Sequence, residues 1–270
     1  MGNEALYASR IFLNAALPLV KVLAEEKPGL AKGFAGKSGV VQVSARNTLP
    51  AVEGGPGPER VGTHFDIVDG KITVVPGLAD KVDVELAFPS VEALNGFFSG
   101  KSKKLPKISG ALGRPGLFLA FLKTLLAMAG ALGATKAPED AEEQALLVKL
   151  FFYLLTSGIS QLNKAGHPAV SKWAKTSPDR VYALAVEGRP ELSAYVRIKA
   201  GNSRAVRGEY ERSKPFFTLA FSSPRAALGT LLSEDEMLQA TAEGKIIMKG
   251  APEFGAQVGE FLLLVGSLAK

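Results

Sequence analysis

The side chains that most often carry out catalysis or bind metals are few in this chain and lie far apart. The sequence of 270 residues contains no cysteine and only two histidines, His64 and His167. A metal site needs several ligands that converge on one point, and neither histidine belongs to a cluster with ligand spacing. The sequence therefore predicts no metal and no other bound cofactor.

Motifs for nucleophilic catalysis and nucleotide binding are also missing. The chain has no Gly-x-Ser-x-Gly elbow and no Walker A sequence, and the glycines at 110, 113 and 116 do not have dinucleotide-loop spacing. Acidic groups at 139–140 and 234–236 fall at expected helix starts, where carboxylates complement the helix dipole. We expect a non-catalytic protein, and an enzyme acting on a lipid is the weaker alternative.

Apolar side chains offer a different chemistry, the binding of a hydrophobic molecule. The segment 116–134 is 19 residues long with one charge, Lys123, and other helical stretches are apolar on nearly all faces. A helix of a small domain buries one face, so the surplus favours an apolar cavity or a membrane contact over plain core packing. The expected cavity-lining residues are Phe118, Phe121, Leu122, Leu125 and Met128 in the first half, and Met237, Met248, Phe254, Val258, Phe261, Leu262 and Val265 in the second.

Positive charge favours an anionic partner. The net charge is +6, and basic residues gather at 101–107 and along a predicted hairpin at 197–212. Each cation near an anionic membrane contributes about 1 kcal/mol, whereas a solvated surface is the plain alternative. No aromatic side chains are interleaved for base stacking, so we expect no nucleic acid. The expected membrane or headgroup contacts are Lys101, Lys103, Lys104 and Lys107.

The elements that must position these side chains occur twice in the sequence. Several short segments recur in the same order, at an offset of 133 and then of 140, so the second half has seven additional residues after Phe221. Val41 and Val181 form a further pair, at offset 140. The matching segments are 86–88 with 219–221, 110–111 with 250–251, and 121–122 with 261–262.

Each half is expected to contain a helix, strands, a short helix, another strand and a closing apolar helix. The first helices span 4–23 and 138–164, and Ser90 and Ser223 are expected to cap the short helices. Asp69-Gly70 indicates a type I′ hairpin turn, and Gly201-Asn202 is expected to form the matching turn. The fold class is therefore α+β, with two repeated domains at residues 1–135 and 136–270.

This order of elements resembles the sterol carrier protein family. The resemblance rests on the sequences at 217–223 and 244–250 in the second half, and at 69–74 and 83–88 in the first. It implies that each domain is a small, largely antiparallel sheet covered by helices around an apolar cavity. The first half departs from the family pattern at 100–107 and lacks the seven additional residues.

The function implied by this resemblance is the binding, and the transfer or presentation, of a hydrophobic lipid in an apolar tunnel. Sterols, fatty acyl chains and isoprenoid-like molecules are the ligand classes, and an anionic membrane surface is a second partner. The alternative is a scaffold for a lipid- or quinone-biosynthesis enzyme. Glu4 stands where a signal peptide would carry positive charge, so we expect a cytoplasmic protein, with a monomer favoured.

Overall fold

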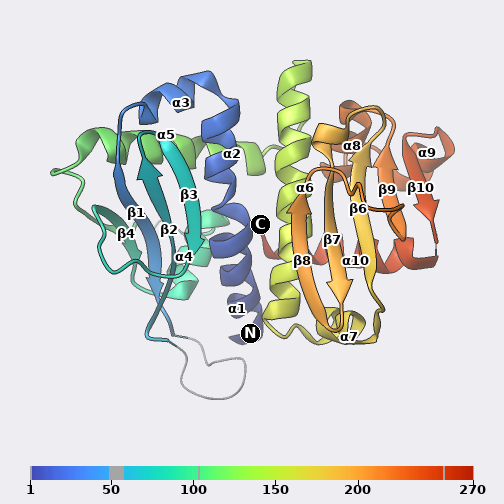
Figure 1. Ribbon diagram of the computed structural model, residues 1–270, viewed down its shortest axis with the longest axis horizontal. Coiled ribbons are helices and arrows are strands. Elements are labelled where there is room, and N and C mark those ends of the chain that lie inside the picture. Colours follow the sequence, from blue (N-terminus) through green and yellow to red (C-terminus); the bar gives the residue numbers. More distant parts are fainter. Residues whose placement is uncertain (1, 49–57, 103, 252, 270) are drawn as a thin grey trace. The chain divides into compact units, whose positions relative to one another are not determined.

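The computed structural model describes residues 2–48, 58–102, 104–251 and 253–269. It divides into two compact units, unit 1 (residues 1–130 with 268–270) and unit 2 (residues 131–267). Each unit contains one five-stranded sheet with helices against it (Figure 1). The protein is thus a mixed α+β protein.

Unit 1 is built around the sheet β3-β2-β1-β4-β5, in which only the β1–β4 pair is parallel. Its helices are α1 (Gly2–Ile11), α2 (Leu19–Glu26), α3 (Pro28–Phe34), α4 (Val91–Phe98) and α5 (Pro115–Leu132), with a π-helical turn η1 (Phe12–Ala16). Its strands are β1 (Gly39–Arg46), β2 (Arg60–Val68), β3 (Lys71–Pro76), β4 (Val84–Phe88) and β5 (Lys107–Ser109).

Helices cover one face of this sheet, which we call the inner face of unit 1. Val41 and Val43 of β1 both lie on this face, because side chains alternate along a strand, and their paired residues on β2 and β4 are buried. The hydroxyl of Thr63 donates a hydrogen bond to the carbonyl of Leu13, 2.6 Å away, and so ties η1 to β2. The core of unit 1 therefore lies between the sheet and the helices α2, α4 and α5 with η1.

Unit 2 has the sheet β10-β9-β6-β7-β8. Its helices are α6 (Ala141–Lys164), α7 (Pro168–Thr176), the 3-10 turn η2 (Pro190–Leu192), α8 (Pro224–Leu231), α9 (Met237–Ala242) and α10 (Glu253–Leu268). Its strands are β6 (Arg180–Val186), β7 (Ala194–Lys199), β8 (Asn202–Arg207), β9 (Phe217–Phe221) and β10 (Ile246–Gly250).

The two sheets have the same strand order, β3-β2-β1-β4-β5 in unit 1 and β8-β7-β6-β9-β10 in unit 2. In each sheet the first strand along the chain and the fourth pair in parallel, and the other pairs are antiparallel. Phe88 and Phe221 both end the strand that runs parallel to the central one. A Cβ on Gly110 would overlap the carbonyl oxygen of Asp83, and one on Gly250 would overlap that of Phe216. Both glycines therefore allow a close backbone approach at the end of an edge strand.

Two sequence-based alignments are wrong by one residue. Val41 pairs with the first residue of β4 and Tyr182 with the first of β9, so Tyr182, not Val181, matches Val41. The second hairpin turns at Ala200 and Gly201, with φ of 49° and 78°, rather than at Gly201-Asn202. Glycine occupies the second turn position, as it does in the Asp69-Gly70 turn, which is confirmed by φ of 48° and 79°.

The predicted helix starts and the named strands agree with the structure, but two strands were missed. The hydroxyls of Ser90 and Ser223 accept hydrogen bonds from the amides of Ala93 and Ala226, at 3.2 and 3.1 Å. The predicted helix 4–23 is divided by η1 into α1 and α2. Strands β1 and β6 were not predicted. β6 is a nearly continuous apolar run that lacks polar alternation, whereas β1 does alternate, at Val41-Gln42-Val43-Ser44, and its pattern was missed.

Candidate functional site

The predicted cavity residues of unit 1 divide into two groups along α5. Phe121, Leu125 and Met128 are fully buried, and the ring of Phe121 packs edge-on against Phe65 of β2, with centroids 4.9 Å apart. Phe118 and Leu122 are only half-buried. The first group forms the sheet–helix core, and the second leaves apolar surface beside it.

The same division holds for α10 in unit 2. Val258, Phe261 and Val265 are buried, and a Cβ on Gly158 of α6 would overlap the side chain of Val265. Phe254 and Leu262 are half-buried. Here too, part of the predicted cavity set is buried and part remains accessible.

The two predicted methionines of unit 2 lie closer to the surface. Met237 begins α9 and is 58% exposed, and Met248 on the edge strand β10 is 48% exposed. The sulfur of Met248 lies beside Gly255 of α10, where a Cβ would be 3.1 Å from it. Met248 therefore borders the sheet–α10 layer, whereas Met237 is an exposed side chain of the additional helix.

A row of aromatic rings follows the inner face of the unit 2 sheet. Phe261 of α10 contacts Trp173 of α7, with ring centroids 5.1 Å apart, and Trp173 contacts Tyr182 of β6 at 4.9 Å. Tyr182 contacts Phe216 at 5.8 Å, and Phe216 contacts Phe254 at 4.9 Å. The sequence pointed only to the two α10 members of this row as site residues.

Arg180 stands at one end of the aromatic row and was not predicted as a site residue. Its guanidinium carbon lies 3.7 Å from the ring centroid of Phe216 and 4.8 Å from that of Phe254. Such cation–π contacts stabilise a partly desolvated cation by about 1–2 kcal/mol. Nothing in the sequence marked this arginine, because its ring partners are distant along the chain.

A polar cluster occupies the opposite, outer face of the unit 1 sheet. One carboxylate oxygen of Glu85 accepts hydrogen bonds from Gln42 at 2.8 Å, Ser44 at 2.7 Å and Arg60 at 2.6 Å. Burial by itself raises the pKa of Glu85, but the three donors outweigh it and hold the pKa below its ordinary value. The charge is thus satisfied within the sheet, which indicates a stabilising role.

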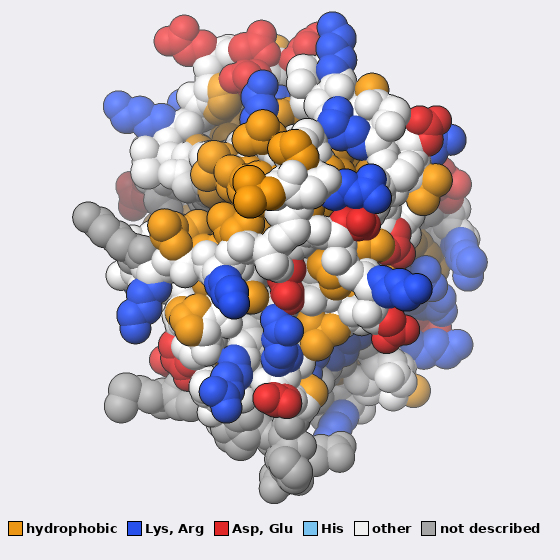
Figure 2. Space-filling view, turned by 90° about the vertical axis from the view of Figure 1, so that its left-hand side faces the viewer, with side chains coloured by type: hydrophobic (Ala, Val, Ile, Leu, Met, Phe, Trp, Pro, Cys, Tyr) orange, Lys and Arg blue, Asp and Glu red, His pale blue; other side chains and the backbone are white. Residues whose placement is uncertain are grey.

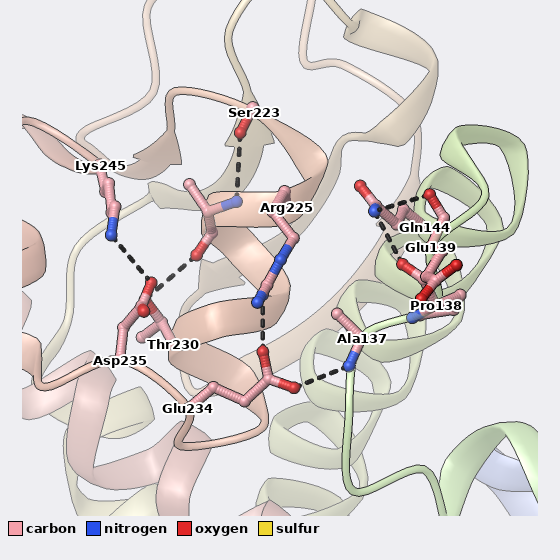
Figure 3. Close-up of polar contacts among 11 residues, drawn as sticks. Ala137, Pro138, Glu139, Gln144, Ser223, Arg225, Thr230, Glu234, Asp235 and Lys245 are labelled. Atoms are coloured by element: carbon pink, nitrogen blue, oxygen red, sulfur yellow. Dashed lines mark hydrogen bonds and ion pairs between the residues drawn. The ribbon is translucent and has the colours of Figure 1, made fainter.

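Acidic residues anchor α9, as Figure 3 shows. The carboxylate of Glu234 accepts a hydrogen bond from the amide of Ala137 at 2.8 Å and pairs with Arg225 at 2.6 Å, and Asp235 lies 3.4 Å from Lys245 (Figure 3). The amide of Ala137 and the Arg225 guanidinium lower the pKa of Glu234 against the effect of burial. These contacts hold the loop that leads into α9, of which Met237 and Leu238 are exposed and Ala240 is buried.

Asp140 caps α6, because its carboxylate accepts a hydrogen bond from the amide of Glu143 at 2.8 Å. The assignment of this acidic group to a helix start is confirmed. Nδ1 of His64 is 3.0 Å from the carbonyl oxygen of Gly77, and His167 precedes α7, where burial lowers the pKa of its imidazole. Within the described ranges, no three His, Cys, Asp or Glu residues gather as metal ligands.

Exposed apolar residues lie among the predicted lysine contacts of unit 1. Lys101, Lys104 and Lys107 are exposed, and Lys103 lies outside the described residues. Leu105, between Lys104 and Lys107, is 74% exposed; Ile108, directly after Lys107, is 45% exposed, and Leu112 before α5 is 99% exposed. In the view of Figure 2, hydrophobic side chains gather into a patch with lysines and arginines around it.

Among the residues that the structure describes, three helical stretches are long and apolar enough to cross a membrane by length and composition: 3–26, 115–132 and 141–164. The first and third are 67% and 72% buried within the protein, but the second, α5, is only 33% buried. Leu119 and Leu126 of α5 are each 60% exposed. Packing therefore accounts for most of the apolar surface of the other two stretches but not for that of α5.

Comparison with known proteins gives a partial likeness. Part of the chain is similar in structure to sterol carrier protein 2. The match has 15% identity and a TM-score of 0.32, and it covers 44% of this chain and 95% of that one. A conserved hypothetical protein from Thermus thermophilus matches with 19% identity, a TM-score of 0.28, and coverage of 41% and 82%. A ubiquinone synthesis protein, UbiJ-SCP2, matches with 20% identity, a TM-score of 0.27, and coverage of 43% and 96%.

No family model and no curated protein matches the sequence. The geometry of the chain itself then defines what the site can do. Each unit presents half-buried apolar side chains next to a closed sheet–helix core, and unit 2 adds an arginine at the edge of an aromatic row. Such a layer can shield an apolar molecule from water and hold a charged group at its rim.

Proposed function

We propose that this chain binds a hydrophobic lipid without catalysing a reaction, and that it transfers or presents this lipid in the cytoplasm. Its two units are proposed to be copies of one sterol-carrier-like domain. The observation that carries the proposal is the unused apolar surface of the closing helices. Phe118 and Leu122 on α5, and Phe254 and Leu262 on α10, remain half-buried beside the buried side chains of the same helices.

The hydrophobic effect sets the scale of this binding. Burial of apolar surface yields about 25 cal/mol per Å², so about 400 Å² of shielded ligand surface gives roughly 10 kcal/mol before binding costs. Loss of ligand freedom offsets several kcal/mol of that sum. An affinity in the micromolar range is therefore the expected scale for one alkyl chain.

The direct test is the lipid content of the natively purified protein. We expect organic extraction and mass spectrometry to find a lipid at a substantial fraction of one molecule per chain. Delipidated protein should then bind a fluorescent fatty acid saturably. A folded protein that neither carries extractable lipid nor binds the probe would contradict the proposal. It would favour the scaffold role, in which the exposed leucines of α5 contact a partner enzyme.

We further propose that the lysine-flanked apolar segment of unit 1 contacts anionic membranes. Leu112 would enter the bilayer interface while Lys104 and Lys107 meet the headgroups. Co-sedimentation with vesicles containing phosphatidylserine should be strong in low salt and should weaken in high salt, because ions screen exposed charges.

A pair of variants distinguishes this contact from nonspecific hydrophobic binding to vesicles. Leu112→Asp should reduce the vesicle-bound fraction severalfold. Val68→Asp, at a 67% exposed position in the hairpin of the same unit, should leave it unchanged. Equal binding to neutral and anionic vesicles at every salt concentration would refute the electrostatic contact.

A further inference from the structure

Arg180 lies on a sheet face that is otherwise apolar. It is the first residue of β6 and pairs with Ile198, which is fully buried. Side chains alternate along a strand, so Arg180 shares the inner face with Tyr182 and Leu184. The positive charge of Arg180 thus lies on the sheet face that α7 and α10 cover, and Arg180 is half-buried there.

The charge of Arg180 has no acidic partner within the part of the chain that the structure describes. The neighbouring carboxylate of Asp179 is taken up by Arg197, at 2.8 and 2.5 Å, with Lys199 at 3.8 Å. The guanidinium instead lies over the rings of Phe216 and Phe254. Stacking uses the flat face of a guanidinium, so the N–H donors at its edge remain available to an oxygen ligand.

The matching place in unit 1 is constructed differently. The strand pairings align the two units residue by residue. In this alignment Gly39 corresponds to Arg180, Asp83 to Phe216 and Arg114 to Phe254. Asp83 and Arg114 form an ion pair at 3.4 Å, and Asp83 also accepts a hydrogen bond from the amide of Val40 at 2.8 Å. In unit 1 the charges of Asp83 and Arg114 therefore neutralise each other. In the described part of unit 2, the charge of Arg180 has no counter-ion.

We infer that Arg180 binds the carboxylate of a single-chain amphiphile whose tail lies against the half-buried apolar side of α10. One guanidinium matches one carboxylate in charge and can donate two parallel hydrogen bonds to it. The half-buried rings of Phe216 and Phe254 supply apolar surface next to this anchor, and Leu262 is a half-buried residue about two turns further along α10. This inference rests on the proposed lipid binding and adds that unit 2 selects an anionic lipid.

The test compares two probes on delipidated full-length protein: a fluorescent 16-carbon fatty acid and the primary alcohol with the same chain and fluorophore. The parent protein should prefer the acid by about tenfold to hundredfold, the usual effect of a charge-assisted hydrogen bond. Arg180→Met keeps an apolar stem and should lose this preference, with the affinity for the alcohol unchanged. The matched control, Arg114→Met in unit 1, should keep the preference.

Each other result has a separate meaning. If the parent binds acid and alcohol equally, the carboxylate anchor is wrong while lipid binding stands. If it binds neither probe saturably, the proposed function itself fails. Should Arg180→Met not fold, Arg180→Lys retains the charge and should keep a reduced preference for the acid. Loss of the preference in Arg114→Met alone would place the anchor in unit 1 and overturn the inference.

Discussion

Replacing Glu85 by alanine should lower the free energy of unfolding by about 2–4 kcal/mol. This is the range expected when a part-buried carboxylate is removed and its hydrogen-bond donors are left without an acceptor. Gln42, Ser44 and Arg60 all donate to the same carboxylate oxygen. The Glu85 side chain is 19% exposed, so water can replace only part of these contacts. Urea unfolding followed by circular dichroism measures the loss.

A matched control exists on the other sheet. Thr218 lies at the position of β9 that corresponds to Glu85 of β4, counted from the parallel strand pairs. Thr218→Ala should cost less than about 1 kcal/mol, since it removes no carboxylate from a network. If both variants lose the same stability, the hydrogen-bonded cluster is not the reason for the effect.

The pH dependence of stability should follow the same carboxylate. The folded-state pKa of Glu85 lies below the ordinary value of 4.5, so its contribution is complete above that pH and is lost as the pH falls through the folded pKa. The parent protein should therefore lose stability in acid more steeply than Glu85→Gln. Parallel acid-unfolding curves for the two proteins would show that Glu85 does not contribute in this way.

Replacing Phe261 by alanine should lower the free energy of unfolding by about 3–5 kcal/mol, as for other buried phenylalanines. Its side chain is 5% exposed, and its ring packs against Trp173. The sequence indicates a cavity-lining residue here, and truncation of such a residue costs less stability. The packing that the structure shows leads us to expect the full cost of a core cavity.

Leu262, the next residue on α10, provides the contrast. It is half-buried, so Leu262→Ala should cost less than about 2 kcal/mol while weakening binding of the fluorescent fatty acid severalfold. The measurements are urea unfolding and probe titration on both variants. If Phe261→Ala is as stable as the parent, or if Leu262→Ala binds lipid normally, the division of α10 into core and ligand-facing residues is wrong.

Local signals in the sequence determined much of the secondary structure. The Asp69-Gly70 turn and the serine caps at 90 and 223 depend on a few adjacent residues, because turn and cap geometry is decided by nearby backbone and side-chain chemistry. The apolar closing helices were equally visible from composition. The strand β6 was not, since a strand buried on both faces loses the polar alternation that marks a strand, whereas β1 keeps that alternation and was missed.

The sequence by itself thus determined an α+β chain with recurring elements, an apolar surplus and few groups for chemistry. Only the tertiary structure decided which apolar side chains are core and which remain accessible, because Phe261 and Leu262 are both apolar and adjacent but face different surroundings. It also decided where the charges act. Glu85 gains its donors, and Arg180 its aromatic rings, from residues distant in the sequence, and such pairs form only when the sheet and its helices assemble.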